Sequence, residues 1–108
     1  MDKRIENYEV CLPDWGAVLP ELATLLSAEY SGGQFEAAED AFCDSGRDSA
    51  EWSMIGANGL SVTIIFEKYE GYLFGTIKGC GQSFSKAKLL LYSSYISQGG
   101  NPNAQARP

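Results

Sequence analysis

The side chains that most often perform acid–base and nucleophilic chemistry are scarce in this sequence. It contains no histidine and three cysteines, Cys11, Cys43 and Cys80. Without histidine the chain cannot build a Ser-His-Asp or Cys-His arrangement, and it lacks the usual nitrogen ligand of zinc. The cysteines are too far apart for the short spacing of a structural zinc site, and an odd number argues against a disulfide framework. We therefore expect three reduced thiols, no metal and no cofactor.

The segment Gly79-Cys80-Gly81-Gln82-Ser83 is the one place where a thiol could be activated. It lies between a predicted strand and a predicted helix capped by Ser83, and backbone N–H groups at a helix start can bind an anion or lower a thiol pKa. It lacks the third glycine of a dinucleotide fingerprint and the Gly-Lys-Ser/Thr ending of a phosphate loop. We interpret it as a tight turn, with a ligand-binding or thiol-dependent enzyme domain using Cys80 as an alternative.

Carboxylates are plentiful, and many of them gather in one segment. The acidic residues of this segment are Glu36, Glu39, Asp40, Asp44, Asp48 and Glu51. A calcium loop beginning at Asp40 would need an oxygen ligand at its third position and glycine at its sixth, but Phe42 and Ser45 stand there. Paired acids could also serve glycoside hydrolysis, yet among 14 acids some pair always lies close. The pattern favours a solvated acidic segment without catalytic function.

Charge is distributed unevenly along the chain. The net charge is −6, but residues 5–51 contain eleven acids and one base, whereas residues 52–108 contain two acids and five bases. Nucleic acids and anionic membranes are bound through lysine and arginine, so the composition argues against both as direct partners. Two interpretations remain open: the acids only keep the protein in solution, or the acidic half steers a basic partner.

Hydropathy patterns predict the elements that would position these residues. Alternating apolar and polar residues predict strands at residues 5–12, 52–55, 60–67 and 72–78. Apolar residues at helical spacing predict helices at residues 20–30 and 84–97, and a short, ambiguous one at 34–44, followed by a loop over 43–50. Asn58-Gly59 and the 68–71 segment supply hairpin turns, so the last three strands should form a meander.

These elements predict a two-layer α+β fold. An antiparallel sheet, built of the three-stranded meander plus the N-terminal strand, would have two main helices packed on one face. Residues 1–98 form a single predicted domain, and residues 99–108 a flexible polar C-terminal tail. The chain has no apolar run long enough to span a bilayer and no apolar segment after its first basic residues. We therefore expect a soluble, cytoplasmic protein.

The functional hypothesis is a small acidic, non-enzymatic protein-binding module. It would act as an inhibitor or immunity protein, bacterial or phage in type, that neutralises a basic, nucleic-acid-handling partner. The expected contact residues are the six acids from Glu36 to Glu51, with Trp52 as an aromatic anchor. A third class, an oligomeric adaptor or a protein resembling secretion chaperones, would pack a sheet face across a dimer. The sequence leaves open whether the chain is a monomer or a homodimer.

Overall fold

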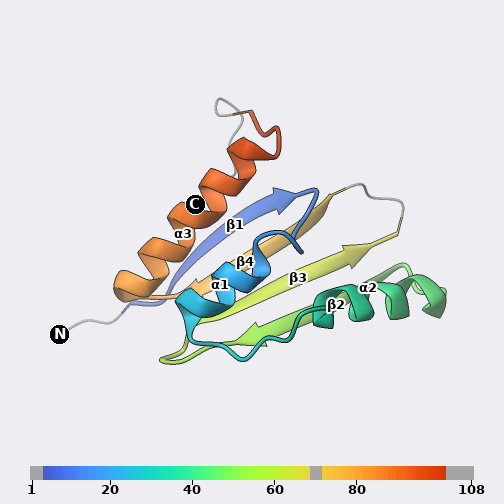
Figure 1. The fold of residues 1–108 in the computed structure, drawn as a ribbon, viewed down its shortest axis with the longest axis horizontal. Helices are drawn as coiled ribbons and strands as arrows, with labels where there is room; N and C mark the ends of the chain where they lie inside the picture. The colour runs from blue at the N-terminus through green and yellow to red at the C-terminus, as the bar shows by residue number, and fades with distance from the viewer. Residues whose placement is uncertain (1–3, 69–71, 102–108) are drawn as a thin grey trace.

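The protein forms one antiparallel sheet with helices on one of its faces (Figure 1). The structure, a computed structural model, describes residues 4–68 and 72–101 of the 108. In chain order the elements are β1 (Glu6–Leu12), α1 (Leu19–Leu26), α2 (Gln34–Ser45), β2 (Ser49–Ile55), β3 (Ser61–Glu67), β4 (Leu73–Gly79) and α3 (Gly81–Ser97). The two-layer α+β fold predicted from the hydropathy pattern is confirmed.

The strands lie in the order β1-β4-β3-β2, so the chain's first strand pairs with its last. Val10 lies opposite Gly75, and Gly75 lies opposite Ile64 on β3. The hairpin between β2 and β3 turns at Asn58 and Gly59, both with positive φ angles of 58° and 79°. The second hairpin loop, predicted at 68–71, lies largely outside the described residues. The meander and the added N-terminal strand follow the prediction.

Alternating burial along the strands places the core between the sheet and the helices. The strands contribute buried side chains at every second position, among them Val10, Ile64 and Ile77, and α1 contributes Leu19, Leu22 and Leu26. Burial of such apolar area is the main favourable term in folding. Figure 1 shows all three helices in front of the sheet: α3 beside β1 and β4, α1 over the middle, and α2 over β2.

Trp15 connects the chain after β1 to the middle of the sheet. Its indole is 1% exposed, and its Nε1–H donates to the Leu73 carbonyl at 2.8 Å. Gly75 makes room for the ring, since a Cβ at that position would lie 2.3 Å from Trp15 Cζ2. Trp15 is therefore a core residue, and Gly75 is required for its packing.

Several predicted boundaries were wrong. The first helix ends at Leu26 instead of Tyr30, because Ser27 adopts a left-handed conformation with φ of 55°. The ambiguous segment is a helix that runs to Ser45, so the expected loop over 43–50 shrinks and β2 begins at Ser49. The last helix starts at Gly81 with Cys80 as its N-cap, and no Ser83 cap exists. In the described residues, the two predicted main helices and the short predicted helix all cover the sheet.

The opposite face of the sheet carries no helix in the part of the chain that the structure describes. One row across this face consists of Cys11, Phe74, Ile65 and Glu51, each opposite the next in strand register. Phe74 is 41% exposed.

Within residues 4–68 and 72–101, none of the helices has both the length and the apolar character needed to cross a membrane.

Candidate functional site

Helix α2 differs from the other helices in what its sequence presents to solvent. It contains four acids, Glu36, Glu39, Asp40 and Asp44, and no base, and its one fully buried residue is Phe35. Gly33 and Gly46, with φ angles of 86° and 75°, flank it in left-handed conformations that glycine adopts without strain. The helix is therefore bounded by its glycines and leaves most of its surface free.

Of the acids on α2, only Glu36 is placed to stabilise the helix, because it lies in the first turn, where the helix dipole favours a negative charge. Glu36, Asp40 and Asp44 follow one another at four-residue spacing, where like charges repel by a few tenths of a kcal/mol per pair. Asp44 lies in the last turn, where the helix dipole favours a cation, and that turn contains no basic residue. All three side chains are exposed. The repulsion along this stripe and the position of Asp44 cost a little stability, so folding does not explain the arrangement.

Aromatic side chains attach α2 to the sheet. Phe35 meets Trp52 edge to face, with ring centroids 5.2 Å apart, and Phe42 stacks on Phe66 at 5.5 Å. Tyr30, from the segment before α2, meets Trp52 at 6.1 Å. Such pairs stabilise by about 0.5–1.5 kcal/mol beyond their burial. A few rigid rings thus hold a helix whose other residues are polar or small.

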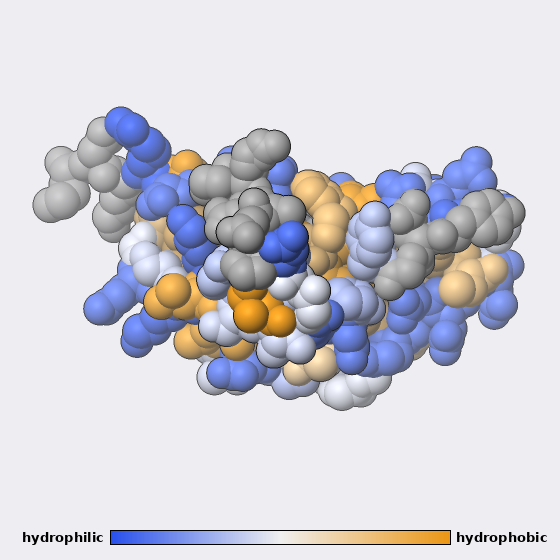
Figure 2. Space-filling view, turned by 90° about the horizontal axis from the view of Figure 1, so that it is seen from above, coloured by the Kyte–Doolittle hydropathy of each residue, from blue (hydrophilic) through white to orange (hydrophobic). Residues whose placement is uncertain are grey.

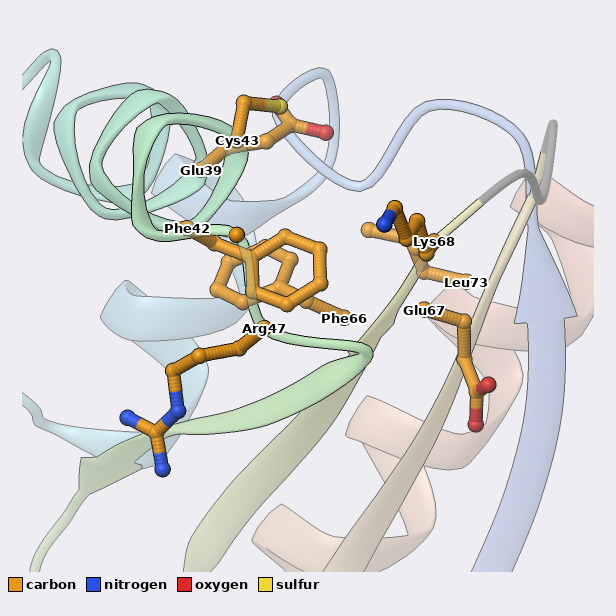
Figure 3. A pocket seen from close by; sticks show the side chains of 9 residues that line it. Glu39, Phe42, Cys43, Arg47, Phe66, Glu67, Lys68 and Leu73 are labelled. Carbon is orange, nitrogen blue, oxygen red and sulfur yellow. The ribbon is translucent and has the colours of Figure 1, made fainter.

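Two cavities flank α2, and both have aromatic walls. The first, of about 260 Å³, lies between α2 and the ends of β3 and β4 (Figure 3). Its lining includes Phe42, Phe66 and Leu73, together with the charged residues Glu39 and Lys68. Figure 3 shows the two phenyl rings between α2 and the strands, while the Arg47 guanidinium and the Glu67 carboxylate point away from them.

The second cavity, of about 250 Å³, lies on the β2 side of the helix. Phe42, Arg47 and Phe66 line it as well as the first cavity, and Ala38, Ala41 and Trp52 complete its apolar wall. We call the exposed side of α2 together with these two cavities the α2 surface. It combines apolar hollows with an acidic ridge.

An acid from elsewhere in the chain joins this ridge. Asp14 lies in the turn after β1, where its Oδ1 accepts from the Ala17 N–H at 3.2 Å. The Glu36 carboxylate passes over Gly16: a Cβ there would lie 2.5 Å from Glu36 Oε2 and 3.4 Å from Asp14 Oδ1. Asp14 was not among the predicted contact residues, because only the fold brings it near α2.

Like charges crowd the carboxyl of Glu39. Burial raises the pKa of its carboxyl, and the negative charges of Asp40, Glu36 and Asp14 raise it further. Among the described residues, two cations lie beside the six predicted acids: Arg47 lines both cavities, and Lys68 Nζ lies 4.0 Å from Asp48 Oδ1. The potential around α2 is therefore negative.

The predicted contact residues do not all share one surface. Glu36, Glu39, Asp40 and Asp44 lie on α2, and Asp48 lies in the short connection to β2. Trp52 points toward α2 and is half-buried among aromatic rings. Glu51, one residue earlier on the strand, projects from the opposite face of the sheet, in the row with Ile65 and Phe74. The structure thus separates Glu51 from the helix acids.

The alternative site at Cys80 has a different setting. Cys80 is half-buried at the N-cap of α3, with extended backbone angles, and it lines neither cavity of the α2 surface. The residue before it, Gly79, is closely packed: a Cβ there would lie 2.2 Å from Leu60 Cδ2. Neither of these two cavities could therefore serve a ligand-binding or thiol-dependent domain that uses Cys80. Among the described residues, no three cysteine or acidic side chains are grouped so that they could hold a metal ion.

Hydrophobic residues also reach the surface on the α3 side. Figure 2 views the molecule from above and shows hydrophobic side chains between hydrophilic ones. On α3, Leu89 is 66% exposed and Ile96 37%, and Ile5 before β1 is 57% exposed. Scattered apolar residues of this kind are normal on protein surfaces.

Comparison of the chain with protein-family models, curated proteins and solved structures found no match.

Proposed function

We propose that this chain is a non-enzymatic protein-binding module whose α2 surface binds a basic protein. The observation that carries the proposal is the exposed acidic stripe of Glu36, Asp40 and Asp44, whose four-residue spacing is repulsive, on a helix flanked by two cavities with aromatic walls. Exposed charges of one sign raise association rates with a partner of opposite sign. The aromatic walls can receive arginine side chains, which stack on aromatic rings.

The biological role we propose is that of an inhibitor or immunity protein in the cytoplasm. Carboxylates held on a rigid helix can occupy a surface built for phosphates, so a nucleic-acid-handling protein is the expected target. Among the described residues, Cys11, Cys43 and Cys80 form no disulfide, which fits a reducing compartment. The proposal needs no catalytic group on this chain.

Affinity capture from the source cell at low and high salt tests this proposal. The test variant carries Glu36→Gln, Asp40→Asn and Asp44→Asn, and the control carries Glu6→Gln, Glu9→Gln and Glu21→Gln, the same charge change away from α2. We expect the wild type and the control to capture a basic protein at low salt, and the α2 variant to lose it. Capture that is indifferent to salt, or equal for both variants, would contradict the proposal.

A self-associating adaptor is the second candidate, and the uncovered sheet face favours it. The row of Cys11, Phe74 and Ile65 places apolar side chains on a face without helices. A stable dimer buries about 800 Å² per partner. Light scattering at high protein concentration decides between the candidates: a dimer would support the adaptor, and a monomer would exclude it.

A further inference from the structure

The free edge of β2 presents backbone groups that the sheet does not use. In an antiparallel pair, opposite residues alternate between exchanging hydrogen bonds and facing away from each other. At one end of the β2–β3 hairpin, the Gly56 N–H donates to the Leu60 carbonyl at 2.8 Å, and beyond the other end the Lys68 N–H donates to the Asp48 carbonyl at 3.0 Å. These two bonds show that the even-numbered residues of β2 exchange backbone hydrogen bonds with β3.

The odd-numbered residues therefore direct their N–H and C=O groups away from β3. They are Ser49, Glu51, Ser53 and Ile55, and all four are exposed. In the described part of the chain, β2 has one strand neighbour, β3, and stands at the end of the sheet order. The strand thus offers a row of alternating backbone donors and acceptors to another chain.

This edge lacks the usual protection against added strands. Natural edges carry lysines, prolines or bulges, or are very short. β2 is seven residues long, has neither lysine nor proline, contains a single charge at Glu51, and leaves Ile55 70% exposed. The ladder pairs every residue of β2 with one residue of β3, so it contains no bulge. The edge is open, regular and able to accept a fifth strand.

Charge around the edge selects what can pair with it. α2 packs against β2 through Phe35 and Trp52 and carries its acids on the helix side of the sheet, while Glu51 lies on the other side. If two copies paired β2 with β2, they would bring two acidic helices alongside each other, which like-charge repulsion opposes. A lysine- or arginine-rich strand would instead meet acids on both faces.

We propose that the β2 edge binds an extended basic segment of the partner protein as a fifth strand. This inference rests on the proposed function and names its mode of binding. Backbone hydrogen bonds from Glu51, Ser53 and Ile55 provide the pairing, and alternate basic side chains of the segment reach the acids of α2 or Glu51. Partners are then recognised by charge pattern and extended conformation.

The test uses a seven-residue probe peptide of alternating lysine and valine, capped at both ends. A peptide of alternating lysine and proline has the same charge but cannot form a regular ladder. Binding is measured by titration at low salt, and amide hydrogen exchange is followed by NMR. We expect the valine peptide alone to slow exchange about tenfold at Glu51, Ser53 and Ile55, and to leave Asn7 and Glu9 on the other edge strand unchanged.

Two variants test whether the peptide binds through backbone hydrogen bonds of β2. Ser53→Pro removes one edge-facing N–H without removing a bond to β3, and Ser53→Ala controls for the lost hydroxyl, which contacts Thr63 Oγ1 at 3.2 Å. We expect the proline variant to bind the valine peptide about tenfold more weakly and the alanine variant to bind within about twofold of wild type. If Ser53→Pro does not fold, Ser49→Pro replaces it, since proline is tolerated at the first residue of a strand.

The outcomes separate this inference from the proposed function. Equal binding of both peptides, or equal effects of the proline and alanine variants, would overturn strand addition while the capture of a basic protein could still succeed. Edge protection that rises with protein concentration, without peptide, would identify a second copy as the occupant and overturn the basic segment. Failure of the capture experiment alone would overturn the proposed function.

Discussion

The two ends of the sheet are covered in different ways. From β1 to the middle of the sheet, α3 and α1 bury seven side chains: Leu19, Leu22, Ala23, Leu26, Phe84, Ala87 and Leu91. Over β2 lies α2, which contains four of the acids and fully buries only Phe35. One end resembles an ordinary apolar core, and the other is a charged helix held by aromatic contacts. The first end therefore buries more apolar surface and should contribute more of the stability, while α2 leaves most of its acids exposed.

Truncating a buried side chain at the α1 end should cost much more stability than truncating an aromatic side chain at the α2 end. Leu22 is 0% exposed at the centre of the α1 contact, so Leu22→Ala should lower the free energy of unfolding by about 2–5 kcal/mol. Urea denaturation of the wild type and the variant measures the change. A loss below about 1 kcal/mol would mean that α1 does not anchor the fold.

Adding a methyl group to the core, instead of removing atoms, also tests this end of the sheet. Gly75→Ala places a methyl group against the Trp15 ring, so we expect a loss of about 1–3 kcal/mol. Gly32→Ala is the matched control, since no atom lies within 4 Å of a Cβ at Gly32. Thermal denaturation of both variants should show a clear drop in Tm for Gly75→Ala only; equal Tm values would refute the tight Trp15 contact.

The α2 end should tolerate a larger truncation at lower cost. Phe42→Ala removes more atoms than Leu22→Ala, but Phe42 is only half-buried and lines both cavities. We expect a loss of about 1–2 kcal/mol, mainly from the stacking on Phe66. If urea denaturation gave a loss as large as that of Leu22→Ala, the contrast between the two ends would disappear.

The smallest expected effect concerns the charge of Glu39. Because its pKa is raised in the folded state, the folded protein holds a proton at pH values where the unfolded chain has lost it. Stability therefore rises as the pH falls through the raised pKa toward the ordinary glutamate value, and the charged form is unfavourable at neutral pH. Glu39→Gln should stabilise by a few tenths of a kcal/mol at pH 7, and this gain should vanish toward pH 4.

Denaturation curves at both pH values provide the check, with Glu6→Gln as the control for a lost charge. A destabilised Glu39→Gln variant at pH 7 would show that the carboxylate is held by a favourable partner, contrary to the crowding by acids.

Strands and turns were predictable because their signals are local. Alternation identified β3 and β4, and Asn58-Gly59 identified the hairpin. The start of β2 was missed because Ser49 and Glu51 face solvent and need not be apolar. The end of α1 was missed because a serine adopts the left-handed cap that glycine usually signals; there the Ala28 N–H donates to the Ala23 carbonyl at 2.9 Å.

The candidate site was predictable only in part. The acids of α2 are visible as a cluster in the sequence, but Asp14 joins them through the fold, and Glu51 leaves them because strand neighbours project to opposite faces. The open edge of β2 follows from the strand order, which places the second strand of the chain at the end of the sheet. Long-range arrangement of this kind has no local signal.

One measurement tests most directly whether α2 binds rather than stabilises. The variant Glu36→Gln/Asp40→Asn/Asp44→Asn is assayed both for unfolding free energy and for binding of the captured basic partner. We predict unchanged or slightly raised stability, since repulsion at four-residue spacing is relieved, together with binding at least about tenfold weaker at low salt. Lower stability with undiminished binding would contradict the account, because the acids would then serve the fold.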